Sequence, residues 1–293
     1  MPKPPKNKPS SPGASDIPLL AWLATSVSIL TFLFYLKAGE VLLYGDAVAH
    51  INIARRVFDS KTPGLLQLGT VWLPLQHLLM IPFLASMNMW RSGAGGSIPS
   101  MAAYVFGVVG MFRLTRCGLT GSNPPDEVAR AAAWIAALIY AANPNLMYMQ
   151  STAMGDVVYL AFFIWAVVYF CEWLHGNPAA LARCGLCLAG ASLTRYDGWF
   201  LAVAITVAVL LVSGKQVLAG RGRVALQGRG KDTQTAGALA PNAVIRFLLI
   251  TAAAPALWLA YNAIVYRNPL EFENGPYSAK AIERRTQSAG NPG

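Results

Sequence analysis

Residues 17–36 decide the fold, and their sequence is IPLLAWLATSVSILTFLFYL. The stretch has no charged side chain, and its length matches the roughly 20 residues that a helix needs to cross a bilayer. It lacks a small-residue cleavage site and is long for the apolar core of a signal peptide, so we expect a retained membrane anchor. Its backbone must be helical because lipid offers no hydrogen-bond partner to an open strand.

The composition of the whole chain indicates that this span is one of several. Of the 293 residues, 55% are hydrophobic and only 12% are charged. An ordinary soluble domain has about 25% charged residues. The mean hydropathy is +0.44. We therefore predict an all-α polytopic membrane protein.

The net charge is +10, from 23 Lys and Arg against 13 Asp and Glu. The basic residues gather in the N-terminal tail and in residues 214–244, a pattern typical of segments that stay in the cytoplasm. Membrane topology accounts for this charge, so we expect no nucleic-acid partner. The same rule places the N-terminus inside and the segment that begins at Glu40 outside.

Further apolar runs predict the other crossings. Pro74 and Pro82 interrupt residues 71–89, so either this run forms re-entrant or interfacial half-helices, or one of the later boundaries is misplaced. We expect a bundle of about seven or eight transmembrane helices, with short helices in a long first outer loop. The remaining candidate spans are residues 98–114, 128–142, 156–174, 180–194, 198–213 and 245–266.

Three segments follow from this pattern. Residues 1–16 are rich in Pro, Lys and Ser and predict a disordered basic tail on the cytoplasmic side. Residues 17–266 form the transmembrane module. Residues 267–293 form either an outer loop or the truncated end of a longer protein, because the chain stops among turn-forming residues.

The first outer loop holds the residues most suggestive of chemistry, within YGDAVAHINIARRVFD at positions 44–59. This stretch predicts a short amphipathic helix. Asn52, Arg55 and Arg56 share one face, whereas Asp46 and His50 fall on another side together with apolar residues. An unpaired charge on an apolar side is costly, so we interpret Asp46 and His50 as functional.

Two more outer turns each carry an acid at a span end: Asp156 in one, and Asp197 in the run TRYDGW at 194–199. Ionisable groups at such places indicate function. The structural alternative is that both acids only cap helices and that Arg195 only reaches toward lipid headgroups. The predicted topology brings all three turns to one face of the membrane.

The four cysteines, Cys117, Cys171, Cys184 and Cys187, lie in or beside apolar helices. Cys184 and Cys187 have a metal-ligand spacing, but their flanks read as membrane helix and no second pair accompanies them. We therefore interpret them as small packing residues and predict neither a disulfide nor a zinc site there.

The ordered set of outer motifs resembles a known superfamily. The run GDAVAHINIARRV at 45–57, followed by QLGTVWLPL at 67–75, resembles the first-loop signature of GT-C membrane glycosyltransferases. The likeness is greatest to bacterial enzymes that use a polyprenyl-phosphate-linked sugar, and more distant to protein O-mannosyltransferases. Residues 143–156 and 194–199 are similar to later motifs of the same superfamily.

The resemblance implies a sugar transferase of the bacterial inner membrane with an extracytoplasmic site. Asp46, His50 and Asp156 would be catalytic, with Asp46 as base. His50 would orient Asp46, bind a metal or neutralise phosphate. The residues implied to bind substrate are Arg195, Tyr196, Asp197, Arg55, Trp72 and Tyr277.

The resemblance leaves the metal open. Members with a divalent-metal site often have paired acids in the second outer loop, whereas here Gly155 precedes the single acid Asp156. A Mg²⁺ or Mn²⁺ ion held by Asp46 and Asp156 is therefore one alternative, and a metal-free reaction is the other.

The implied partners are membrane lipids, a polyprenyl-phosphate sugar donor, and a glycan, lipid or protein acceptor. A lipid or solute transporter or flippase is the alternative function, but it would need polar residues at mid-span, and here they gather at span ends. A non-catalytic membrane scaffold is the third.

Overall fold

The computed structural model describes residues 16–120, 122, 124–226, 241–288 and 290. The predicted tail at 1–16 lies outside these residues except for Asp16, which opens the first helix. The described chain is all-α, without a strand. Five of its helices, α1, α5, α8, α10 and α11, are long and apolar enough to cross a membrane. The all-α membrane fold is therefore confirmed.

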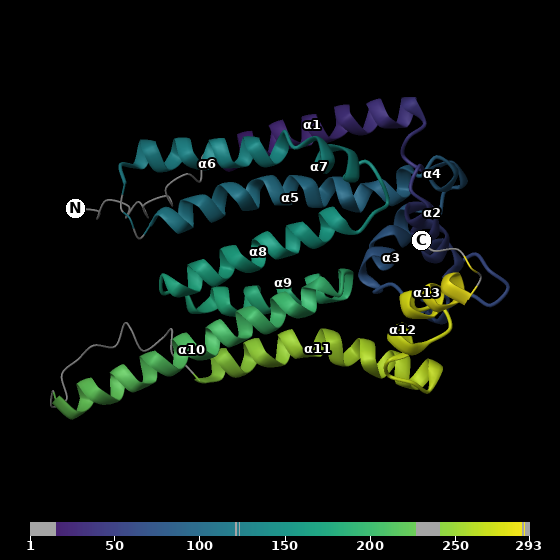
Figure 1. Cartoon of the computed structure of the whole chain (residues 1–293). Helices are drawn as coiled ribbons and strands as arrows, with labels where there is room; N and C mark the ends of the chain where they lie inside the picture. The colour runs from purple at the N-terminus through teal and green to yellow at the C-terminus, as the bar shows by residue number, and fades with distance from the viewer. Residues whose placement is uncertain (1–15, 121, 123, 227–240, 289, 291–293) are drawn as a thin grey trace, which may run out of the picture.

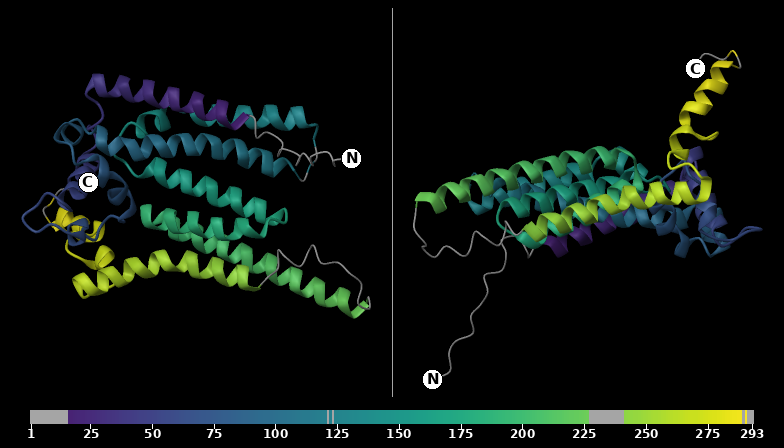
Figure 2. Two further views of the ribbon diagram at one scale, coloured as in Figure 1. Left: turned by 180° about the vertical axis from the view of Figure 1, so that it is seen from behind. Right: turned by 90° about the horizontal axis from the view of Figure 1, so that it is seen from below.

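The long elements lie side by side along one direction and form a layer (Figures 1 and 2). Neighbouring pairs pack in the order α1 on α5, α5 on α6 and α8, α8 on α9, and α9 on α10 and α11. Their bounds are Asp16–Ala38 (α1), Ala94–Leu119 (α5), Asp126–Ala141 (α6), Asp156–Leu174 (α8), Pro178–Thr194 (α9), Asp197–Leu226 (α10) and Pro241–Tyr266 (α11).

Short helices gather at one end of this layer, on the right in Figure 1, together with the C-terminal segment. They are α2 (Gly45–Arg56), η1 (Leu65–Leu68), α3 (Leu75–Met80), η2 (Ile81–Phe83), α4 (Met87–Arg91), α7 (Pro144–Met149), α12 (Glu271–Asn274) and α13 (Ala279–Ser288). The segment between α1 and α5 therefore contains short helices, as predicted for the first long loop.

The broken run at 71–89 forms no single span. Pro74 stands directly before α3, and Pro82 lies inside η2. A proline has no N–H to donate, and it disfavours the helical conformation in the residue before it. The run therefore divides into short helices. This agrees with the half-helix alternative.

Several predicted boundaries were wrong. The helix expected at 98–114 is longer, because Gly95 and Gly96 let it pack closely against Phe83 and Ala153. The basic segment 214–244 is not all loop, since α10 continues to Leu226. Residues 227–240 of that segment lie outside the described residues.

The outer surface of the layer is apolar. Trp22, Phe200 and Ile264 are 74–80% exposed. In water such side chains would be unfavourable, whereas a bilayer accommodates them. Buried clusters join the helices inside the layer, and Tyr104, Leu181 and Phe247 are among their members. A further cluster attaches α2 to α3 through Ile51 and Met80.

Candidate functional site

Two histidines meet where α2 packs on α3. His50 Nδ1 lies 2.8 Å from His77 Nε2, within one hydrogen bond. The His50 ring also lies 4.9 Å from the Trp72 ring, centroid to centroid. His50 is 7% exposed and His77 is fully buried. The pair is thus enclosed by protein at the end of the helix layer.

Burial keeps this pair uncharged. Burial, with smaller contributions from the neighbouring His50 and Arg56, lowers the pKa of His77 to about 3. Burial also lowers the pKa of His50, against the opposing effect of the carboxylates of Asp46 and Asp156. Near neutral pH both imidazoles are therefore neutral, and one ring donates to the other.

A second group of charges stands beside the histidines. Arg195 Nη1 donates to Asp156 Oδ1 at 2.9 Å, and Arg195 Nε donates to Asp197 Oδ2 at 2.9 Å. The Arg195 guanidinium also lowers the pKa of His50. We call Asp46, His50, His77, Asp156 and Arg195 the polar cluster. It joins α2, α3, the start of α8 and the turn after α9.

One oxygen of this cluster is poorly satisfied. Among the described residues, Asp156 Oδ2 is buried and has no hydrogen-bond partner, and the same holds for His77 Nδ1 and Gln76 Oε1. A buried polar atom without a partner is costly and is a sign of a bound ligand or water. Gln76 also approaches the chain beside Asp156, because its Nε2 donates to Ala153 O at 3.2 Å.

Asp46 does not lie where its helix pattern predicted. The side of α2 that packs on the protein carries Ala47, His50, Ile51 and Ala54, and Asp46 is exposed at its edge. The small side chains of Ala47 and Ala54 allow close packing, and this decides which side is buried. Asp46 nevertheless stays close enough to raise the pKa of His50 against the larger lowering effect of burial.

Tyr196 belongs to the wall beside the polar cluster. Its hydroxyl accepts from Trp258 Nε1 at 3.2 Å, and its ring stacks on Phe272 at 4.9 Å between centroids. Burial raises the pKa of Tyr196, so its hydroxyl stays protonated. Through these contacts the turn after α9 is attached to α11 and to the C-terminal segment.

Two other predicted substrate-binding residues lie elsewhere. Arg55 bonds Asp59 and the carbonyl of Leu84, and its guanidinium lies 4.7 Å from the centre of the Trp90 ring. Through these contacts Arg55 attaches α2 to η2 and α4. Tyr277 is 69% exposed in the C-terminal segment. Neither side chain belongs to the polar cluster.

His77 and Gln76 are residues that sequence reasoning missed. They stand together in an apolar run between two prolines. Two adjacent polar residues in such a run could have indicated a functional site. Their contacts with His50 and Ala153 depend on how α3 folds back on α2 and the loop before α8. No periodicity within 71–89 predicts that arrangement.

An apolar cavity of about 490 Å³ lies along the helices, and its lining includes no residue of the polar cluster. Its lining includes Leu79 and Val158, each two residues beyond His77 or Asp156, and then Phe106, Phe162 and Trp165 farther along the helices. The cavity lies among α3, α5, α8 and α9 and suits a hydrocarbon chain rather than a polar solute.

The polar cluster offers a poor set of ligands for a metal ion. In the described part of the chain, no three His, Cys or acidic ligand atoms gather around Asp46 and Asp156. Arg195 already places a positive charge on Asp156. The Mg²⁺ or Mn²⁺ ion stays a prediction.

Comparison of the chain with models of known protein families, with curated proteins and with solved structures found no match. The site is therefore interpreted from its own geometry. Its main features are two neutral histidines and one guanidinium bonded by two carboxylates, and the same helices also line an apolar cavity.

Proposed function

We propose that the protein is a membrane glycosyltransferase of the GT-C type, which moves a sugar from a polyprenyl-phosphate donor to an acceptor. The acceptor is an envelope glycan, lipid or protein. The observation that carries the proposal is the presence of a polar cluster and an apolar cavity to which the same helices, α3 and α8, both contribute. A donor with a charged head and a hydrocarbon tail needs both environments side by side.

The proposed reaction is a displacement at the anomeric carbon. An acceptor hydroxyl forms the new bond to that carbon, while the bond from the carbon to the phosphate oxygen breaks with its electron pair. The proton of the hydroxyl passes to a carboxylate acting as base, a role worth about 10²–10⁴-fold in rate. Asp46 suits this role because it is exposed to an incoming acceptor and adjoins His50.

Arg195 is the proposed partner of the departing phosphate. A guanidinium has five N–H groups in a planar fork that fits phosphate oxygens. The bonds to Asp156 and Asp197 use two of these groups. Asp156 therefore orients the guanidinium, and the remaining N–H groups stabilise the charge that develops on phosphate.

The neutral state of His50 limits its role. Because burial lowers the pKa of His50, the ring does not supply positive charge to phosphate near neutral pH. Its hydrogen bond to His77 instead fixes the orientation of the ring beside Asp46. Of the three predicted roles, this chemistry disfavours neutralising phosphate, and we propose that His50 positions the base.

The proposal includes a topology. All seven long helices, α1, α5, α6, α8, α9, α10 and α11 of the described chain, would cross the inner membrane of a bacterium. The shorter ones, α6 and α9, would do so with flanking polar residues drawn to the interface. The basic N-terminal tail would lie in the cytoplasm and the polar cluster outside.

Sugar transfer in membranes from cells expressing the full chain tests the proposal. Membranes receive radiolabelled polyprenyl-phosphate sugars, and labelled acceptors are counted. We expect Asp46→Asn to reduce transfer at least about 100-fold. Glu127→Gln, which changes an exposed acid at the other end of the layer, serves as the matched control.

Two results would count against the proposal. Transfer that persists with Asp46→Asn would overturn the assignment of Asp46 as base. Absence of transfer by the unaltered protein, combined with movement of labelled lipid between the two leaflets of a vesicle, would favour the transporter.

A further inference from the structure

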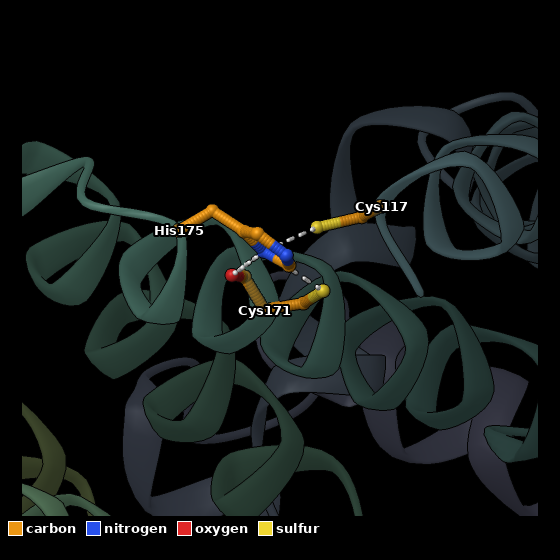
Figure 3. Close-up of side chains that lie close together, drawn as sticks. All are labelled: Cys117, Cys171 and His175. Atoms are coloured by element: carbon orange, nitrogen blue, oxygen red, sulfur yellow. Dashed lines mark hydrogen bonds between the residues drawn. The ribbon is translucent and has the colours of Figure 1, made fainter. Parts of the chain in front are cut away.

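A second group of reactive side chains lies at the opposite end of the helix layer from the polar cluster. Cys117 stands in the last turn of α5, Cys171 in the last turn of α8, and His175 directly after α8. Figure 3 shows the three side chains converging between these two helix ends. Cys171 and His175 share one helix face through their spacing of four residues.

The distances within this group match those around a metal ion. His175 Nδ1 lies 3.7 Å from the sulfur of Cys117 and 3.7 Å from the sulfur of Cys171. In a tetrahedral zinc site the sulfur and nitrogen ligands stand about 3.6 Å apart, given bonds of about 2.3 Å to sulfur and 2.0–2.1 Å to nitrogen. All three ligand atoms lie within 4.8 Å of one another.

The two helix ends are held together independently of the cysteines. Arg113, one turn before Cys117, forms an ion pair with Glu172, the neighbour of Cys171. The Arg113 guanidinium also lies 5.1 Å from the centre of the Trp165 ring on α8. The separation of the two sulfurs is therefore set by the packing of α5 on α8, and little rearrangement is needed to bind a metal.

We infer that Cys117, Cys171 and His175 form a binding site for Zn²⁺. Two sulfurs and one imidazole favour zinc over the hard cations Mg²⁺ and Ca²⁺, which prefer oxygen. Binding releases the thiol protons, because thiolates are the ligands. His175 Nδ1 exchanges its 2.8 Å contact with the carbonyl of Cys171 for a bond to the metal.

The fourth position of the metal is left for water or an external ligand. In the described part of the chain the group contains three ligating side chains, and His175 is exposed. The ion would tie the C-terminal end of α5 to that of α8, at the opposite end of the layer from α2 and α3 (Figure 1). The inference therefore stands without the proposed sugar transfer.

Metal binding by the purified full chain in detergent tests the inference. The protein is treated with a chelator and a reducing agent, and it is then titrated with Co²⁺ as a coloured substitute for Zn²⁺. We expect one Co²⁺ per chain, a thiolate-to-cobalt absorption band, and displacement of Co²⁺ by Zn²⁺. Cys117→Ser and Cys171→Ser should each weaken binding by more than about 100-fold, beyond the loss typical of outer-shell changes.

The chain contains its own matched control. Cys184 and Cys187 have the spacing of a metal-binding pair, but they lie within α9, away from the group. The double variant Cys184→Ser/Cys187→Ser should bind Co²⁺ as the unaltered protein does. Helicity by circular dichroism confirms that each variant is folded. Equal binding by Cys117→Ser, or lost binding by the Cys184/Cys187 variant, overturns the inference.

Discussion

His50 Nδ1 and His77 Nε2 lie 2.8 Å apart although 27 residues separate them in the chain. The contact joins α2 to the short helix α3, and both rings are buried. Two imidazoles can be buried side by side at low cost only while both are neutral and one donates a hydrogen bond to the other. Acidification therefore acts directly on the attachment of α2 to α3.

The first prediction concerns the stability of the protein toward acid. Burial lowers the pKa of His77 from its ordinary value of 6.5 to about 3. Below pH 6.5 the unfolded chain gains a proton at this position that the folded chain does not. Stability is therefore complete above pH 6.5 and decreases down to about pH 3, by as much as about 1.4 kcal/mol per pH unit.

Thermal unfolding in detergent between pH 7.5 and 5 measures this effect, since carboxylates titrate little in that range. His77→Gln should flatten the dependence on pH. Thr286→Gln, at an exposed position on α13, introduces the same amide without removing a titratable group and should leave the slope unchanged. An equal slope in the His77 variant would show that another group is responsible.

The second prediction separates the structural and chemical roles of Arg195. Its ion pair with Asp156 is partly exposed, with side-chain exposures of 42% and 33%, so the pair adds less than about 1 kcal/mol to stability. As the charge on the leaving phosphate, however, Arg195 should contribute about 10²–10³-fold to the rate. Arg195→Gln should therefore lose transfer activity with little change in melting temperature.

Two companion variants sharpen this test. Arg195→Lys keeps the charge without the planar fork and should recover part of the rate. Arg116→Gln breaks a different ion pair, with Asp126, at the other end of the layer and should leave transfer unchanged. If Arg195→Gln were fully active, the guanidinium would only form ion pairs with Asp156 and Asp197 and would have no role in the reaction.

Hydropathy predicted the long helices because lipid-facing sequence must be continuously apolar. Residues 156–174 were predicted as one span, and α8 has those bounds. The pattern was less informative for α2, where Ala47 and Ala54 carry only a weak apolar signal but pack most closely. The predicted burial of Asp46 was wrong for this reason.

The sequence alone did not predict which distant segments come into contact. The spacing of Cys171 and His175 on one helix was visible, but Cys117 joins them only because α5 packs on α8. Likewise, His77 reaches His50 because α3 folds back between two prolines. Periodicity describes each helix separately and does not fix how a short helix docks.

The third prediction concerns the turn between α9 and α10, which carries Arg195. A Cβ added to Gly198 would lie 2.5 Å from the backbone of Ala191, and no side-chain movement relieves such a contact. Gly198→Ala should destabilise the protein by about 1–3 kcal/mol and displace Arg195. Lower melting temperature together with reduced transfer is the expected result.

Gly214→Ala is the control for that variant. The glycine lies in α10 with no heavy atom within 4 Å of an added Cβ. Alanine there should stabilise the helix by up to about 1 kcal/mol. Equal melting temperatures for the two variants would contradict the close packing of α9 on α10.

The last prediction tests whether the apolar cavity holds the tail of the donor. Ala102 lines the cavity, and phenylalanine at this position would occupy part of its volume of about 490 Å³. A donor with a long polyprenyl chain would then lose apolar contacts worth about 0.8 kcal/mol for each buried CH₂. Ala102→Phe should therefore raise KM about tenfold or more for long-chain donors, but not for a short-chain analogue.

Ala253→Phe supplies the comparison, because Ala253 is exposed on α11 and is absent from the cavity lining. It adds the same ring to the outer, lipid-facing surface and should leave KM unchanged for every donor. Chain length is the decisive variable, since only a bound tail makes the effect of Ala102→Phe depend on it. A KM that rises equally for short and long donors would place the tail outside this cavity and would leave Phe106 and Trp165 as packing residues alone.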